Sequence, residues 1–600
     1  MKNKRIIAIL LVFFALLNLA ACDTGGDGDS SAGTTDETSR STVESTTEST
    51  PDGDGDSEDT PSHEETVKDT EKEPVESSGE GDTPAESTAA DLPDETEQRT
   101  ETTVGNGAGS PESSISEYSR GLDFIMNSDG RSYTCVGAGS CTDPVVSIPP
   151  TYNTLPVTHV GQRSKPMPQN WKNTTTLIIP DNVTLCSGYF VNNPTIDTLI
   201  IGNNCTVEER IFGYSETIRT VRIGENCTLD GSFWDCIGLE VVTIGNGTII
   251  KENSFLKCVN LKSVTLPKNM TYISKGLFAS CTALESITLP ESINRINASA
   301  FSKCSALKSI NIPQGVEKIG DKAFEGCTSL TDIVLPETLS TLGVRAFAGC
   351  TSLQRAVLPQ SIENWHNEVL ADCSALTSVT LPESAESLPP GTFNGCSALK
   401  SVTLPADITQ IGEYAYKGCR SLEEIILPTT VKELGICAFY DCQALKKIDL
   451  HEGIKKIGDY CFLGCHELSE INLPSSLTYL GEFSLSGCPI TEITIPGKIG
   501  IIRRNTFDCC DRLTRITVED GISELSDQAL FFCKSLEYLS LPASVTKIGD
   551  YLATNLLYLE EISFAGTAEQ WNGIAKSDSW DYNAESLKRI VCSDETIELN

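Results

Sequence analysis

Residues 304–326 read CSALKSINIPQGVEKIGDKAFEG, and this unit of 23 residues decides the fold because it recurs along most of the chain. Its first part, Leu307 to Pro313, alternates apolar and polar residues and ends at a proline, as expected of a short strand with one buried face. Its second part, Val316 to Phe324, supplies further apolar residues that return the chain along the opposite side of the coil. A single coil cannot bury its own apolar side, so neighbouring coils must stack. The repeat therefore predicts a solenoid.

The same unit can be followed from Thr174 to Leu559, which gives about eighteen coils of 21–23 residues. We predict a repeat solenoid over residues 174–563 with one short parallel strand per coil. Residues 120–173 are expected to form an N-terminal cap and residues 564–600 a C-terminal cap. At the usual spacing between strands, such a stack would be roughly 85 Å long.

The N-terminus has the pattern of an export signal. Residues 2–5 include three basic side chains, residues 6–17 are apolar, and residues 19–22 read LAAC. The apolar run is short for a membrane-spanning helix, and its end looks like a bacterial lipobox, in which the chain is cut before the cysteine and that cysteine is acylated. We therefore expect residues 1–21 to be a lipoprotein signal peptide and Cys22 to carry the lipid anchor. An ordinary signal peptide is the alternative.

The segment after Cys22 is a predicted tether. Positions 23–119 hold 28 acidic and 4 basic residues, many Ser, Thr, Gly and Pro, and almost no aromatic residues. Such a segment cannot bury enough apolar surface to offset its conformational entropy, and its like charges keep it extended. We expect residues 22–119 to form a disordered acidic tether. The whole chain carries a formal charge of −38, which argues against nucleic acid as a partner because phosphate binding needs clustered Lys and Arg.

Cysteine recurs once per coil. Although an exported protein with 24 cysteines suggests disulfides, a free cysteine beside the leucine column also suits a buried corner as a small apolar side chain. Neighbouring sulfurs would lie within the range that disulfide geometry tolerates, but bridging would change the rotamers of the column, so we expect free thiols there. Cys135 and Cys141 are better candidates for a disulfide, and the residues leave that bridge open. The structural cysteine column comprises Cys236, Cys258, Cys281, Cys304, Cys327, Cys350, Cys373, Cys396, Cys419, Cys442, Cys465, Cys488, Cys510 and Cys533.

The repeat and the segments on either side of it resemble a known family. The flanking segments are Ser132-Tyr133, Ile148-Pro149, Tyr152 and Leu155-Pro156-Val157-Thr158, and then Phe564-Ala-Gly566-Thr567-Ala-Glu-Gln570-Trp571 and Val591-Cys592-Ser593-Asp594. From Gly121 to about residue 594 the chain resembles the BspA-like leucine-rich-repeat surface proteins of bacteria. The resemblance implies a leucine-rich-repeat stack on an exported protein, and for some members a role as an adhesin. The early coils depart from the pattern, because Gly-Asn-Asn or Gly-Glu-Asn precedes Cys205 and Cys227 where later coils have proline.

Candidate catalytic and metal-binding residues are scarce. The chain has five histidines and contains no Gly-x-Ser-x-Gly, His-Glu-x-x-His or Cys-x-x-Cys motif, so we predict no catalytic residues, no cofactor and no metal site. One coil is unusual: Glu363-Asn364-Trp365-His366 replaces the usual Ile-Gly pattern, and Val369-Leu370 replaces Ala-Phe. This coil is either a local surface feature for a ligand or a drift of the repeat.

The outward positions of the predicted strands are polar and mostly small. They form either a broad platform for a protein or glycan partner, or simply a soluble β-surface protected from aggregation. Examples are Lys262, Ser263, Thr265, Glu285, Ser286, Thr288, Lys308, Ser309, Asn311, Thr377, Ser378 and Thr380.

These features favour a lipid-anchored binding or adhesion protein without catalytic activity. We expect it on the cell membrane, extracytoplasmic and exposed at the surface, with proteins or glycans of host or bacterial surfaces as partners. A passive structural or scaffold protein of the cell envelope is the alternative, and an enzyme is a third, weaker hypothesis.

Overall fold

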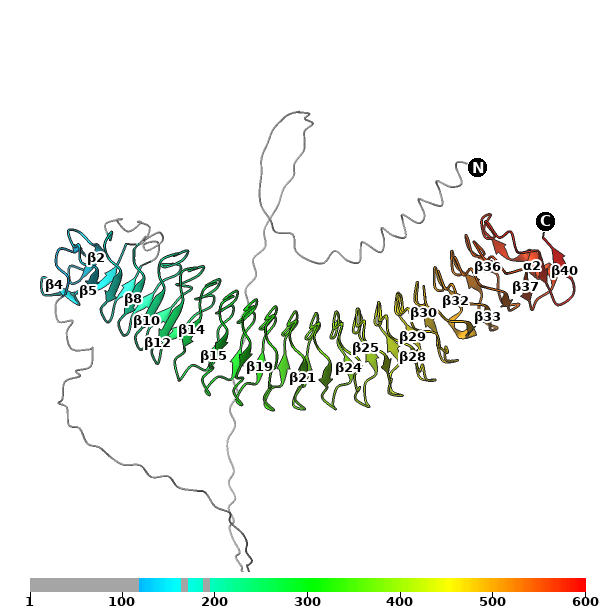
Figure 1. The fold of residues 1–600 in the computed structure, drawn as a ribbon, viewed down its shortest axis with the longest axis horizontal. Coiled ribbons are helices and arrows are strands. Elements are labelled where there is room, and N and C mark those ends of the chain that lie inside the picture. Colours follow the sequence, from blue (N-terminus) through cyan, green and yellow to red (C-terminus); the bar gives the residue numbers. More distant parts are fainter. Residues whose placement is uncertain (1–117, 163–170, 187–194, 600) are drawn as a thin grey trace, which may run out of the picture. The chain divides into compact units, whose positions relative to one another are not determined.

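In the computed structural model the chain winds into about eighteen coils that follow one another in sequence order (Figure 1). The structure describes residues 118–162, 171–186 and 195–599, which belong to one unit of the chain, Asn106–Asn600. The expected signal peptide, the anchor at Cys22 and nearly all of the tether lie outside the described residues. The predicted solenoid is confirmed within them.

One side of most coils carries the strand that the sequence predicts, but the coils that start at Leu330, Leu399 and Leu468 have no regular strand there. These strands pair in parallel with the same position of the next coil, as Ser286 pairs with Ser309, so that one face of every strand is buried against the coil interior. The strands are β3 (Val145–Ser147), β6 (Thr176–Ile179), β8 (Thr198–Ile201), β10 (Thr220–Ile223), β12 (Val241–Ile244), β14 (Ser263–Thr265), β16 (Ser286–Ile287), β18 (Ser309–Ile310), β21 (Arg355–Val357), β23 (Ser378–Thr380), β26 (Glu424–Ile425), β28 (Lys447–Ile448), β31 (Glu492–Ile495), β33 (Arg515–Val518), β35 (Tyr538–Leu541), β37 (Glu561–Phe564) and β39 (Arg589–Val591).

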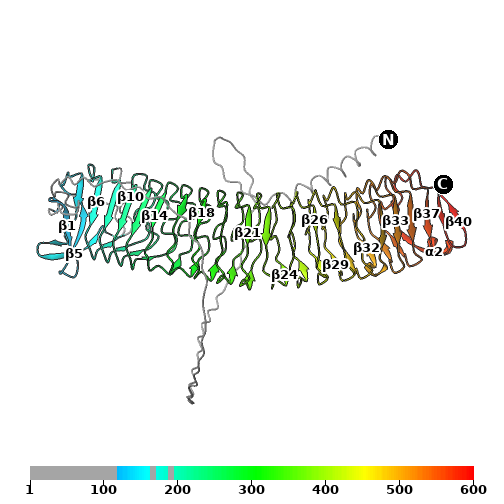
Figure 2. The same ribbon diagram turned by 60° about the horizontal axis from the view of Figure 1, so that its bottom comes forward.

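The return side of the coils also forms strands, which the sequence analysis did not predict. Most are two residues long and pair in parallel, as Ile296 does with Ile319. They are β5 (Leu155–Val160), β7 (Thr184–Leu185), β9 (Thr206–Val207), β11 (Thr228–Leu229), β13 (Ile249–Ile250), β15 (Tyr272–Ile273), β17 (Arg295–Ile296), β19 (Lys318–Ile319), β20 (Thr341–Leu342), β22 (Asn364–Trp365), β24 (Ser387–Leu388), β25 (Gln410–Ile411), β27 (Glu433–Leu434), β29 (Lys456–Ile457), β30 (Tyr479–Leu480), β32 (Ile501–Ile502), β34 (Glu524–Leu525), β36 (Lys547–Ile548) and β38 (Ala575–Lys576). Figure 2 shows strands of this side, such as β24 and β29, apart from those of the other side, such as β6, β10 and β14.

Antiparallel strands finish the stack at both ends. At the start, β1 (Asp123–Met126) pairs antiparallel with β2 (Tyr133–Gly137), and β4 (Thr151–Tyr152) does the same with β5. At the other end, β40 (Thr596–Glu598) pairs antiparallel with β39. The terminal region also holds a short helix, α2 (Ala568–Gly573), and a 3-10 turn, η1 (Gly497–Ile499), occurs earlier. An added antiparallel strand covers a sheet edge that would otherwise present unpaired backbone groups.

A ladder of aromatic rings runs through the core. The rings of Phe301, Phe324 and Phe347, one from each of three successive coils, lie 5.3 and 5.2 Å apart and almost parallel. Leu370, Leu485 and Leu530 take the ladder position in three coils, and all three are buried. The coils approach so closely at their turn glycines that a Cβ on Gly343 would lie 2.3 Å from the backbone nitrogen of Asp321. The repeated Phe and Gly of the sequence are therefore requirements of stacking.

Candidate functional site

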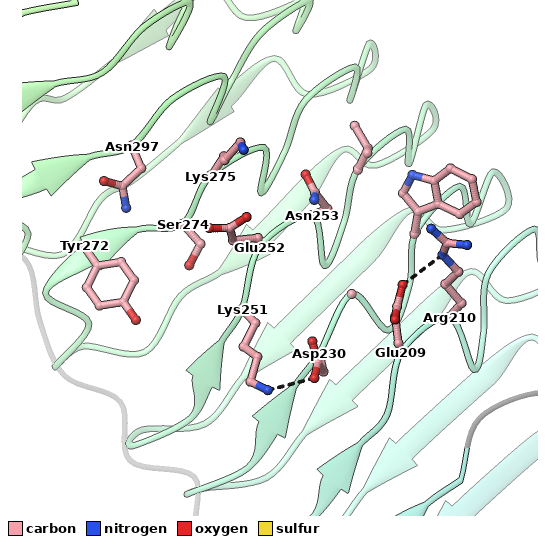
Figure 3. A pocket seen from close by; sticks show the side chains of 13 residues that line it. Glu209, Arg210, Asp230, Lys251, Glu252, Asn253, Tyr272, Ser274, Lys275 and Asn297 are labelled. Carbon is pink, nitrogen blue, oxygen red and sulfur yellow. Dashed lines mark hydrogen bonds and ion pairs between the residues drawn. The ribbon is translucent and has the colours of Figure 1, made fainter. Parts of the chain in front are cut away.

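A groove lies on the return side of the coils where two types of coil meet (Figure 3). In the early coils the corner between the two strands holds Cys205, Cys227 or Thr248, and each of these side chains donates a hydrogen bond to a backbone oxygen of the coil before. From Leu266-Pro267 onward the corner is one residue longer, and in most coils it contains a proline; His451 and Glu519 take the proline position in two of them. The groove spans this change of coil type: its residues from Glu209 to Leu256 come before the change, and those from Tyr272 to Asn297 come after it.

The pairing of strands on the return side is interrupted where the corner becomes longer. Strand β13 is the last strand of one sheet and β15 is the first strand of the next. Side chains connect the two coils instead: Asn269 accepts from the backbone nitrogen of Gly247 at 3.0 Å, Asn246 accepts from that of Lys268 at 3.0 Å, and the Ser274 hydroxyl donates to the Ile250 oxygen. The coils thus stay joined while their outer surfaces separate.

Charged side chains of both signs line the groove. Three are carboxylates, Glu209, Asp230 and Glu252, and three are cations, Arg210, Lys251 and Lys275. Two ion pairs form among these residues, with 3.2 Å between Arg210 Nε and Oε1 of its sequence neighbour Glu209, and 2.7 Å between Lys251 Nζ and Asp230 Oδ2 (Figure 3). These pairs are largely exposed, so they contribute little to stability. They do give the groove a nearly balanced charge.

Aromatic side chains stand at the two ends of the groove. Figure 3 places Tyr272 and Arg210 at opposite ends, and the Arg210 guanidinium packs over the Trp234 ring at 4.6 Å. Tyr214 meets the same indole edge-on at 5.0 Å between ring centres. At the other end the Arg295 guanidinium lies 5.7 Å from the centre of the Tyr272 ring. Stacked cations therefore hold both aromatic groups in place.

The groove has a volume of about 730 Å³, within the range of natural ligand sites. A smaller cavity of about 220 Å³ adjoins it between residues 247–250 and 269–272, and Tyr272 lines both. We call the larger space the junction groove. It extends over five successive coils, from Glu209 to Asn297.

The structural cysteine column is buried, and the structure explains why cysteine recurs there. In almost every coil the thiol donates to the backbone oxygen of the ladder residue 25 or 26 positions earlier, as Cys327 does to Phe301 at 3.2 Å and Cys350 to Phe324 at 3.3 Å. Burial raises the pKa of Cys304 to about 12 and that of Cys327 well above its usual value. The column thiols are thus protonated donors, and the structure has them as free thiols.

The other predicted cysteines lie apart from the junction groove. Cys135 and Cys141 are buried free thiols in the structure: Cys135 Sγ lies 3.9 Å from the Gly137 oxygen and Cys141 Sγ lies 3.6 Å from Asp143. The bridge that the sequence allows between them is thus not formed in the structure. Cys22 lies outside the described residues, so its lipidation stays a prediction.

The polar strand face is exposed as expected, and ion pairs between coils neutralise much of it. Glu240 binds Arg219 of the preceding coil at 2.6 Å and Lys262 of the following coil at 2.8 Å, and these cations lower the pKa of Glu240. The face also shows exposed aliphatic side chains at Val334 and Ile426, which the sequence analysis did not single out.

The unusual coil at Trp365 continues the stack without a break in its core. Val369 and Leu370 are buried in place of Ala and Phe, and the half-buried Trp365 packs against the core. The backbone nitrogen of His366 donates to the Leu342 oxygen of the coil before. This geometry favours drift of the repeat over a ligand site.

The sequence analysis did not identify the groove residues Glu209, Arg210, Trp234 and Tyr272. The signal was present in part, because the early coils were seen to lack the proline of the later ones. The separation of the return sides follows from the difference in corner length, and that effect requires the three-dimensional path of both coils.

Comparison with known families identifies the class of protein. The family model for the BspA type leucine rich repeat region matches the chain in six copies, over residues 169–249, 229–343, 317–446, 386–512 and 432–560. The chain therefore belongs to the BspA-type leucine-rich-repeat family. No curated protein sequence matches it.

Solved structures of bacterial leucine-rich-repeat proteins are similar to this chain. A protein from Bacteroides ovatus is 23% identical, with a TM-score of 0.48, and the match covers 66% of this chain and 98% of that one. A leucine-rich cell surface protein from Faecalibacterium prausnitzii is 19% identical, with a TM-score of 0.31, and the match covers 77% of this chain and 98% of that one. A protein from Eubacterium ventriosum is 18% identical, with a TM-score of 0.29, and the match covers 62% and 94% of the two chains.

Among residues 118–162, 171–186 and 195–599, no three His, Cys, Asp or Glu side chains gather to hold a metal ion. In these same ranges no helix has the length and apolar character needed to cross a bilayer.

Proposed function

We propose that this chain is a binding protein on the outer surface of a bacterial cell, anchored by lipid at Cys22 and held away from the membrane by residues 23–119. The solenoid presents its surface to proteins or glycans of a host or of other bacteria, and it performs no catalysis. Membership of a family with surface proteins supports the location, and the sequence of residues 1–22 supports the anchor.

The junction groove is the observation that favours binding over a passive scaffold. A passive scaffold requires only regular coils whose polar groups pair with those of neighbouring coils. Most of the described coils meet this requirement. At the groove the coils separate, and charged and aromatic side chains line an open volume of about 730 Å³. Such concave sites with convergent polar groups are typical of ligand binding.

Protease treatment of intact cells tests the location and the anchor together. Peptides from the solenoid should be released while the cells stay intact. A Cys22→Ser chain should carry no lipid, so it should either appear in the medium or stay at the membrane with its signal peptide uncleaved, which its larger mass would show. If solenoid peptides appear after cell lysis and not before it, the chain faces an internal compartment and surface binding is wrong. An envelope scaffold would then explain the architecture better.

A further inference from the structure

We propose that the junction groove binds an uncharged oligosaccharide chain, an inference that rests on the proposed function as a surface binding protein. It names the ligand class and the site, neither of which follows from the repeat itself.

The charges of the groove favour an uncharged ligand. Three carboxylates and three cations line it, and both Arg210 and Lys251 already have a carboxylate partner, at 3.2 and 2.7 Å. A polyanion would meet as many repulsive as attractive groups, and so would a polycation. Sugar hydroxyls both donate and accept hydrogen bonds, so they can use the carboxylates, amines and guanidinium of the groove without separating the pairs.

The aromatic groups suit sugar rings. Carbohydrates present faces of C–H bonds that pack on aromatic rings, while the polar edge of Tyr or Trp binds hydroxyls. Tyr272 is 38% exposed, and Trp234 is half-buried beneath Arg210. Both rings are held by stacked cations, so little conformational entropy would be lost on binding.

The groove also has the length and the polar groups for a chain of sugars. Its lining residues come from five successive coils, which at the usual strand spacing corresponds to about 19 Å. Asn253 and Asn297 add amide groups along this path, and each amide can both donate and accept. This length accommodates several sugar units in a row.

Two other ligand classes fit less well. Leu256 is the one aliphatic side chain among the described residues that line the groove, so an apolar molecule or a peptide would find no apolar pocket to bury an anchor residue. A peptide could instead add as a strand where β13 and β15 are unpaired. Asn246, Asn269 and Ser274 already bridge that gap with side-chain hydrogen bonds.

Binding of the full chain to immobilised glycans tests the proposal. The probes are neutral oligosaccharides of several sugars built from glucose, galactose, mannose and N-acetylglucosamine, with sialylated and sulfated counterparts, and fibronectin and gelatin as protein probes. The variants are Tyr272→Ala and Glu252→Gln. The matched controls are Tyr479→Ala and Glu413→Gln, which change the same residue types at the same coil positions outside the groove. Thermal melting of every variant confirms that it is folded.

At least one neutral oligosaccharide is expected to bind, with an affinity about tenfold lower for each groove variant and unchanged for each control. Neutral glycan binding that the groove variants do not weaken, or binding of acidic glycans alone, would overturn the assignment of the groove. Binding of the protein probes alone would overturn the ligand class while leaving the proposed surface function intact. If no probe binds, the proposed ligand and site are wrong. If, in addition, intact cells protect the solenoid from protease, the proposed surface function is wrong as well.

Discussion

The aromatic ladder makes a quantitative prediction for Phe324→Ala. Phe324 is fully buried, and its ring lies 5.3 Å from Phe301 and 5.2 Å from Phe347. Truncating a buried Phe to Ala costs about 3–5 kcal/mol, and the loss of two ring pairs places this site near the upper end of that range. We therefore expect a local loss of about 5 kcal/mol, which corresponds to more than a thousandfold in the equilibrium for opening these coils.

Hydrogen exchange of the full chain measures this loss coil by coil. The reporters are the backbone N–H groups of Phe301, Phe324 and Phe347, each of which donates to the next coil. Each coil contacts its neighbours alone, so the change should be confined to the coils around residue 324 and should not reach residues 501–533. A global unfolding experiment would not measure this local loss, because long repeat arrays do not unfold in one cooperative transition.

The matched control is Phe324→Leu, which places at position 324 the residue that the chain itself uses at Leu370 and Leu485. Because leucine fills most of the space, this change should cost about 1–2 kcal/mol. Equal exchange in the Ala and Leu variants would refute the stacking argument. An equal loss of exchange protection in residues 501–533 would refute the expectation that the destabilisation stays within the coils around residue 324.

Four further outcomes are expected. In the native protein at about pH 8 the column thiols should resist iodoacetamide, and all of them should react in guanidinium. The reason is that only the thiolate reacts and burial raises the pKa of these thiols. Column cysteines found labelled in the native protein by mass spectrometry would contradict this. Burial raises the pKa of Asp508 to about 6, so the folded state binds a proton more readily than the unfolded state. Lowering the pH from about 7 to about 4 should therefore raise the hydrogen-exchange protection of this coil, expressed relative to the intrinsic exchange rate at each pH, and this gain should be absent from Asp508→Asn. Radioactive palmitate should label the wild-type chain and leave Cys22→Ser unlabelled; equal labelling would exclude an anchor at that cysteine. Peptide mapping without reductant should find Cys135 and Cys141 free, as in the structure, and a linked peptide would restore the bridge that the sequence allows.

The fold was predictable because its physical cause repeats in the sequence. The step of 23 residues between cysteines and the alternation from Leu307 to Ile312 suffice to predict stacked coils with parallel strands. The strands on the return side were not predicted, because two-residue segments such as Lys318–Ile319 show no alternation that could reveal them. The aromatic ladder follows from the recurrent Phe, whose rings must meet once the coils stack.

The candidate site was far less predictable. The groove residues Arg210 and Tyr272 are more than sixty positions apart in the sequence, with Trp234 between them. Each of the three looks like an ordinary surface residue of its own coil. What brings them to one groove is a one-residue difference in corner length between neighbouring coils. That difference is visible in the sequence, but its effect on the space between side chains depends on how the corner at Leu266-Pro267 turns.

The antiparallel strands at the two ends have a consequence for how such a protein can evolve. Between β2 and β39 most of the chain is one interchangeable unit, and the end strands β1 and β40 cover the stack whatever its length. Slippage or recombination can add or remove a single 23-residue repeat downstream of Asn297. The coils on either side of the change would still stack with the aromatic ladder and the cysteine column in register. The junction groove and both ends would remain as they are. The length of the solenoid is thus a heritable variable that changes in whole repeats, independently of the junction groove.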